Sequence, residues 1–162
     1  MRGRKRCLIW IACVGALATT ATAAAAPAGE VTRSRYVERA EAVCKPVTQT
    51  AKPVIARALS NLKENQVKRS GGELLEVAKT YEASRAHLRA IAPPPADAAV
   101  LRSWLKTLQE QNAFLRGAGR ELSRERRVPA QGFLARFVHS GNLANDLVLG
   151  FGFNYCLFKQ HT

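Results

Sequence analysis

Few side chains in this 162-residue chain have the type and spacing that metal binding requires. The three histidines are His87, His139 and His161. Helical bundles that hold two metal ions place a glutamate three residues before a histidine, but Ser84 and Arg136 occupy those positions here. A helical period of about 100° per residue puts His139 away from the apolar positions and His87 at their edge. We therefore expect surface histidines and no metal site.

Haem binding and hydrolysis are not predicted either. The chain has no Cys-x-x-Cys-His motif and its one methionine is Met1, so neither covalent haem attachment nor a Met/His ligand pair is expected. Ser84 precedes His87 by one helical turn, but no acidic residue follows to complete a triad. A nucleophile elbow, a phosphate loop and a dinucleotide fingerprint are missing. We predict a protein without cofactor or enzymatic activity.

A stripe of arginines is the strongest chemical feature of the second half of the chain. Its members are Arg116, Arg120, Arg124, Arg126 and Arg127. Basic patches attract anionic lipids and acidic polymers, so the stripe is a candidate polyanion contact. The alternative is a solvated surface that complements the C-terminal ends of helices, because Glu121 and Glu125 interleave with the arginines. No aromatic residues interleave with them, so we expect no nucleic-acid partner.

Residues 1–28 have the order of a secretory signal peptide. Residues 2–6 are mostly basic, residues 7–17 are apolar, and residues 18–28 are mainly alanine and threonine. Small-residue sites predict cleavage somewhere after residues 23–28. The alternative is an uncleaved membrane anchor over the uncharged tract that follows the basic block. Its many alanines and threonines make this tract less apolar than a typical membrane span.

The four cysteines divide between the leader and the exported domain. Cys7 and Cys13 lie in the predicted leader, and too few apolar residues precede Cys13 for a lipid-attachment site. Cys44 and Cys156 remain, and two cysteines in an oxidising compartment have one pairing. The predicted bridge closes a loop of 112 positions and contributes at most about 4–5 kcal/mol. Two free buried thiols are the alternative.

Charge and length describe one basic exported domain at residues 29–162. Removing residues 1–28 takes away four of the 25 basic residues and none of the 12 acidic ones. The domain therefore keeps 21 basic and 12 acidic residues, a net charge of +9. Its length suits a single domain.

Apolar residues recur at helical spacing in four segments of this domain. The segments run over about 35–68, 71–92 and 98–127, and the fourth begins at Pro129. We expect Pro46 and Pro53 to kink or break the first helix, because proline removes a backbone donor and crowds the preceding turn. Ser70 and Glu73 have capping-box spacing, which predicts the start of the second helix. Asp97 is the predicted N-cap of the third.

Four such helices with short links predict an all-α, up-down-up-down four-helix bundle. This topology brings the first helix beside the end of the fourth, so Cys44 and Cys156 are expected to meet. The C-terminal segment is rich in large apolar residues: Phe151, Phe153, Tyr155, Leu157 and Phe158. We expect this segment to fold back and cap the bundle, held by Cys156. An exposed patch for another protein is the alternative.

Three short motifs occur along the mature chain: YVERAEAVC at 36–44, the Leu88–Pro95 turn with three prolines followed by Trp104-Leu105, and FGFNYC at 151–156. Together they resemble a group of exported or lipid-anchored helical proteins from high-GC Gram-positive bacteria. The resemblance implies an exported helical bundle with a terminal disulfide, and it implies no activity, substrate or cofactor. Pro46 and Pro53 depart from the pattern.

From these observations we expect an exported protein that acts without catalysis as a structural or interaction module. Its expected partner is a protein of the cell envelope or extracellular space. The alternative is a basic module that binds anionic lipid or wall polymer through the stripe at 116–127. Salt separates the two, because exposed charges are screened at high ionic strength.

Overall fold

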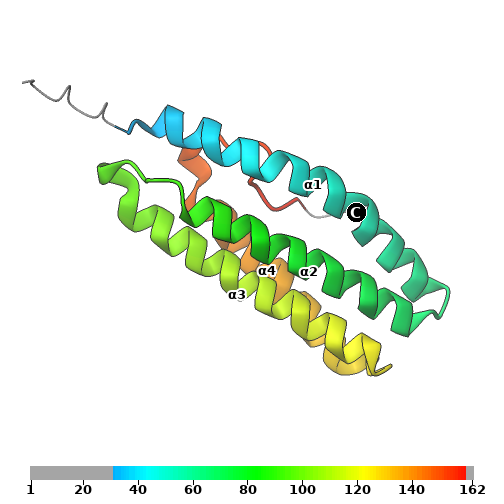
Figure 1. Cartoon of the computed structure of the whole chain (residues 1–162). Helices are drawn as coiled ribbons and strands as arrows, with labels where there is room; N and C mark the ends of the chain where they lie inside the picture. Colours follow the sequence, from blue (N-terminus) through cyan, green and yellow to red (C-terminus); the bar gives the residue numbers. More distant parts are fainter. Residues whose placement is uncertain (1–30, 160–162) are drawn as a thin grey trace, which may run out of the picture.

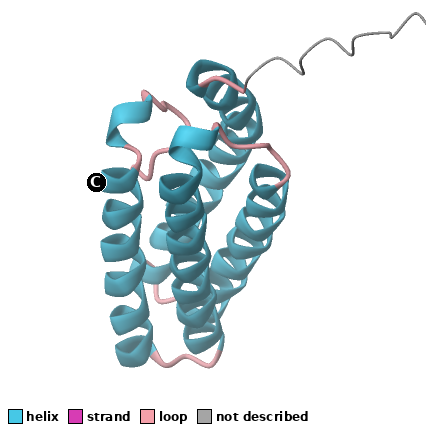
Figure 2. Ribbon diagram, turned by 90° about the vertical axis from the view of Figure 1, so that its left-hand side faces the viewer, coloured by secondary structure: helices cyan, strands magenta, loops and turns pink. Residues whose placement is uncertain are grey.

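A computed structural model of the protein describes residues 31–159. The predicted leader at 1–28 and His161 lie outside the described residues. The elements are α1 (Arg33–Lys63), α2 (Val67–Arg89), the short 3₁₀ helix η1 (Pro95–Asp97), α3 (Ala98–Ser123), α4 (Arg127–Leu147) and the 3₁₀ helix η2 (Leu149–Phe151). The predicted all-α class with four packed helices is confirmed (Figure 2). None of the helices within residues 31–159 combines the length and hydropathy needed to span a bilayer.

Each helix packs against the next one along the chain, α1 on α2, α2 on α3 and α3 on α4. Between α1 and α4 there is no extended contact. The segment that follows α4, residues 148–159, is called the tail here. It runs back beside α1, where Figure 1 shows it as the red segment below that helix. The bundle is therefore closed on its fourth side by the tail over part of its length.

The first helix continues through both internal prolines. Pro46 and Pro53 lie within a 31-residue helix, so the expected break does not occur. The helix changes direction in its middle, as Figure 1 shows, which is how a helix accommodates a missing donor. Thr50 Oγ1 donates to the Pro46 carbonyl at 2.9 Å, within this proline-containing stretch.

The predicted start of the second helix is wrong, whereas the third helix begins where expected, at Ala98 with Asp97 as its N-cap. The second helix begins at Val67, so Ser70 lies inside its first turns, fully buried and without a hydrogen-bond partner for Oγ. Glu73 accepts instead from Arg57 Nε and Asn61 Nδ2 of α1, each at 2.7 Å. At the N-cap of α3 the Asp97 side chain makes no capping bond and accepts from Arg33 of α1 instead. The carboxylates of Glu73 and Asp97 thus each bind an arginine of α1 and not a backbone N–H group at the start of their own helix.

The two helix hairpins turn in the same way. The first and third helices end at Lys63 and Ser123, before the predicted 68 and 127. The turns that follow place Asn65 and Glu125 in the left-handed region, with φ of 65° and 59°. A three-residue link with one left-handed residue is enough to reverse the chain, so each pair of helices is antiparallel.

Glycines allow α2 and α3 to approach closely. A Cβ atom on Gly71 would lie 2.4 Å from the backbone nitrogen of Ser123. One on Gly119 would lie 3.1 Å from the Gly71 carbonyl oxygen. Since no side chain fits between the backbones here, these glycines set the distance between the two central helices.

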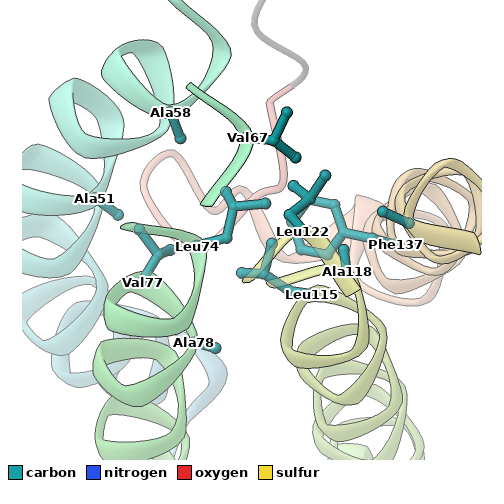
Figure 3. Close-up of a cluster of buried hydrophobic side chains, with 11 residues drawn as sticks. Ala51, Ala58, Val67, Leu74, Val77, Ala78, Leu115, Ala118, Leu122 and Phe137 are labelled. Atoms are coloured by element: carbon teal, nitrogen blue, oxygen red, sulfur yellow. The ribbon is translucent and has the colours of Figure 1, made fainter. Parts of the chain in front are cut away.

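The apolar interior divides into two cores along the bundle axis. The tail-end core includes Tyr36, Ala40, Leu101, Trp104, Val148 and Phe153 together with both cysteines. The second core borders an apolar groove between α1 and α4 and is called the groove-end core. It includes Ala51, Ala58, Leu74, Val77, Leu115, Leu122 and Phe137. Figure 3 shows the groove-end core, to which α1 brings Ala51 and Ala58 as its buried apolar residues. Their small side chains leave space on the α1 side.

Candidate functional site

The structure separates the predicted arginine stripe into three parts. Arg116 and Arg120 line a surface depression of about 640 Å³ between α2 and α3, together with Lys79. The next two arginines pair with Glu121: the guanidinium of Arg126 donates to its carboxylate at 2.8 Å, and Arg124 lies 3.6 Å away. Two of the five arginines therefore share one carboxylate, which balances one of their two positive charges.

Arg127 lies at the C-terminal end of α1. Its guanidinium donates to the Asn65 side-chain oxygen and lies 3.5 Å from the Leu62 carbonyl. Terminal carbonyls of a helix carry partial negative charge, so this cation complements the end of α1. The five arginines therefore do not form one continuous positive surface, and Arg127 binds the end of α1.

The predicted disulfide joins Cys44 of α1 to Cys156 of the tail, with Cα atoms 5.1 Å apart. Around it the tail binds α1 through polar contacts that the sequence pattern did not reveal. The Glu41 carboxylate accepts from three consecutive tail amides, those of Asn154, Tyr155 and Cys156, at 2.9–3.1 Å. A carboxylate that receives several backbone N–H groups forms strong, charge-assisted bonds. No local signal identifies Glu41, because its partners lie more than a hundred residues away.

Further bonds hold the end of the tail. Asn145 of α4 accepts from the Phe158 amide at 2.8 Å and donates to the Phe158 carbonyl at 2.7 Å. Thr48 of α1 donates to the Tyr155 carbonyl at 3.0 Å. The tail is thus fixed to α1 and α4, the two helices that do not pack on each other.

Aromatic stacking also holds the tail against the helices. Phe153, 5% exposed, stacks on the fully buried Trp104 at 5.3 Å between ring centroids. Phe151 stacks in turn on Phe153, with 5.7 Å between ring centroids. The Arg33 guanidinium lies 4.7 Å from the centre of the Phe151 ring. Arg33 also binds the Asp97 carboxylate, and this contact lowers the pKa of Asp97. The segment expected to fold back therefore does so, with Phe153 as its main buried residue.

Beyond the tail, the space between α1 and α4 stays open as an apolar groove of about 670 Å³. This volume lies in the range of roughly 300–1,000 Å³ that is typical of small-molecule sites. The floor belongs to the groove-end core, and the walls come from α1, α4 and the tail. Prominent lining residues are Ile55, Ala58, Leu62, Leu74, Leu115, Leu134, Phe137 and Phe158.

The polar residues of the groove are few and carry no negative charge. Among the described lining residues, the charged ones are Lys52 and Lys159, and none is aspartate, glutamate or histidine. Burial raises the pKa of Tyr81 to about 12, so its phenol stays protonated and can donate a hydrogen bond. Ser70 also belongs to the lining, although its Oγ is covered. Such a lining favours binding over acid–base or nucleophilic chemistry.

A smaller chamber of about 100 Å³ adjoins the groove beneath the tail. Tyr81, Leu157 and Phe158 line both spaces. The chamber also borders the disulfide and the side chains of Arg85 and Gln111. Arg85 binds Glu82 at 2.5 Å through one terminal nitrogen, while its Nε is buried without a hydrogen-bond partner. The chamber has space for a few water molecules at most, whereas the groove has space for a larger molecule.

The two histidines within residues 31–159 do not line this groove. His87 on α2 and His139 on α4 are both exposed, as the helical period predicted. Within residues 31–159 no group of His, Cys, Asp or Glu side chains is placed to hold a metal ion.

The chain was compared with known families and proteins. No protein family, curated protein or solved structure matches it.

Proposed function

We propose that this protein is an exported, non-enzymatic binding protein that holds a small apolar molecule in the groove between α1 and α4. The observation that carries the proposal is that the tail closes only part of this side of the bundle. Residues of the hydrophobic core, including Leu74 and Leu115, thus line an open groove. Exposed apolar concavities of this kind are favourable for ligands because binding removes apolar surface from water.

Export is part of the proposal. Its supports are the signal-peptide order of residues 1–28, the disulfide between Cys44 and Cys156, and the resemblance to exported helical proteins of high-GC Gram-positive bacteria. Mass spectrometry of the protein from its native host should find a mature N-terminus after one of residues 23–28. An intact leader would instead favour the uncleaved anchor.

An apolar fluorescent reporter tests the groove. N-phenyl-1-naphthylamine should bind the folded domain and gain fluorescence. Leu134→Trp should abolish binding by filling the groove, since Leu134 lies half-buried in its α4 wall. Leu147→Trp is the matched control, because Leu147 is exposed on the same helix and outside the groove. Equal binding by both variants would refute the groove as the site.

A partner protein of the cell envelope or extracellular space fits this proposal as the donor or acceptor of the bound molecule. A second candidate function is polyanion binding, for which the favouring observation is the depression whose charged lining residues are Lys79, Arg116, Arg120 and one acid, Glu82. Binding to anionic vesicles should then fall with rising salt and with Arg116→Gln/Arg120→Gln. Binding that does not depend on salt would count against it.

A further inference from the structure

We infer that the occupant of the groove is a long-chain fatty acid, with its alkyl chain along the groove and its carboxylate at the rim beside Lys52 and Lys159. This inference rests on the proposed function and adds the class and charge of the ligand.

The shape of the groove suits an alkyl chain. On α1 the groove is lined by Lys52, Ile55, Leu59 and Leu62, which follow one another at helical spacing along a single face. Ten residues of helix correspond to about 15 Å, so this wall is long and narrow. Leu115 lies on the opposite, floor side. An extended apolar chain buries its whole length against such a wall.

The charges lie at the end of the groove next to the tail. Lys52 follows Thr48, which binds the tail, by one helical turn, and Lys159 directly follows Phe158. Lys159 Nζ donates to the neutral Asn154 side-chain oxygen at 3.2 Å, and no carboxylate within residues 31–159 forms an ion pair with it. Because the described lining holds no carboxylate, an anionic head group meets attraction here and a cationic one meets repulsion.

A single negative charge fits the rim best. The two lysines are exposed and flexible, and the exposed Gln49 adds a neutral amide donor at the same end. There is no arginine among the described lining residues to bind a phosphate in the bidentate way. The rim therefore matches a carboxylate better than a dianionic phosphate. The tail closes this end of the groove, which limits the room for a partner helix between α1 and α4.

Competition against the neutral naphthylamine reporter tests this inference on the full mature domain. The probes are dodecanoic acid, decanoic acid, dodecanol, dodecyl phosphate and dodecyltrimethylammonium, each below its aggregation concentration. Dodecanoic acid should bind about fivefold more tightly than dodecanol at low salt, and this preference should shrink at high salt. Removing two methylenes should weaken the acid roughly tenfold.

Lysine variants assign the head-group position. Lys52→Gln and Lys159→Gln should each weaken dodecanoic acid about twofold, and the double variant should bind acid and alcohol alike. Binding of dodecanol should not change. Lys106→Gln is the control, because Lys106 is 79% exposed on α3 and outside the groove.

The outcomes distinguish the inferred ligand class from the proposed binding groove. Reporter binding with equal affinity for acid and alcohol, or tighter binding of the cationic or phosphate probe, would overturn the fatty-acid inference and leave the groove intact. Absence of reporter binding by the folded domain would overturn the proposed function itself.

Discussion

The tail-end core and the groove-end core differ in how the space between α1 and α4 is filled. At the tail end, Trp104, Phe153 and the Cys44–Cys156 bridge occupy it, so that side chains are buried on every side. At the groove end, α1 offers Ala51 and Ala58, and no segment within residues 31–159 covers the opening. One end of the bundle is therefore packed on all sides, and the other leaves apolar surface open.

The largest expected difference between the two ends concerns a large side chain in each. Trp104→Ala should lower the free energy of unfolding by about 3–5 kcal/mol, because it empties a fully buried site and removes the stacking partner of Phe153. Leu134→Ala at the half-buried groove wall should cost only about 1 kcal/mol. Urea denaturation measures both values. Equal costs would contradict the contrast.

Removal of the disulfide is the next test. Cys44→Ala/Cys156→Ala should destabilise the domain by about 2–4 kcal/mol, since the bridge restricts the unfolded chain across 112 positions. Hydrogen exchange should become faster at the tail amides of Asn154 to Cys156 before it does in α2 and α3. Uniform acceleration over the whole chain would show that the tail is not a separate unit.

The same substitution at two alanines of α1 gives a matched comparison. Ala40 in the tail-end core and Ala58 in the groove-end core are both fully buried. Ala40→Val should cost about 1–3 kcal/mol through overpacking. Ala58→Val should cost less than about 1 kcal/mol, because Ala58 borders the groove. The helix propensity of valine affects both variants equally, so the difference between their unfolding midpoints reports the packing alone.

Ser70→Ala tests the corrected start of α2. If Ser70 were a capping residue, this change would lower the free energy of unfolding by about 1 kcal/mol. Because Ser70 Oγ is buried without a partner, we expect no loss, and a gain of up to about 1 kcal/mol. Thermal denaturation distinguishes the two signs. A clear loss of stability would restore the capping box.

The smallest effect is the pH dependence of the ion pair at the tail end. The hydrogen bond from Arg33 lowers the pKa of Asp97, so the pair stabilises the fold at neutral pH and loses this effect as the pH falls through the lowered pKa. Asp97→Asn should therefore be less stable than the wild type at pH 7, with a difference that shrinks below about pH 4. Glu82 also has a lowered pKa, through Arg85, but it is present in both proteins. A difference independent of pH would contradict the role of Asp97.

Much of the fold could be predicted from local patterns. Helical spacing indicated the four helices, and parity together with compartment indicated the bridge between Cys44 and Cys156, because each depends on the chain's own periodicity and composition. Local patterns did not predict which partners the capping side chains bind, although they placed Asp97 correctly at the N-cap of α3. Ser70 and Asp97 are suitable capping residues locally, yet Ser70 became buried against neighbouring helices and Asp97 binds Arg33.

The candidate groove could not be foreseen in the same way. Alanines on α1 are compatible with a tightly closed bundle as well as with an open one, and the bonds from the tail to Glu41 and Asn145 join residues far apart along the chain. The sequence alone therefore determined that this is a basic, disulfide-linked helical chain, because amphipathic period, charge and cysteine parity are properties of the residues themselves. Only the tertiary structure decided that the tail seals one end of the α1–α4 side and leaves the other open, since that outcome depends on how side-chain volumes from four separate helices fill a shared space.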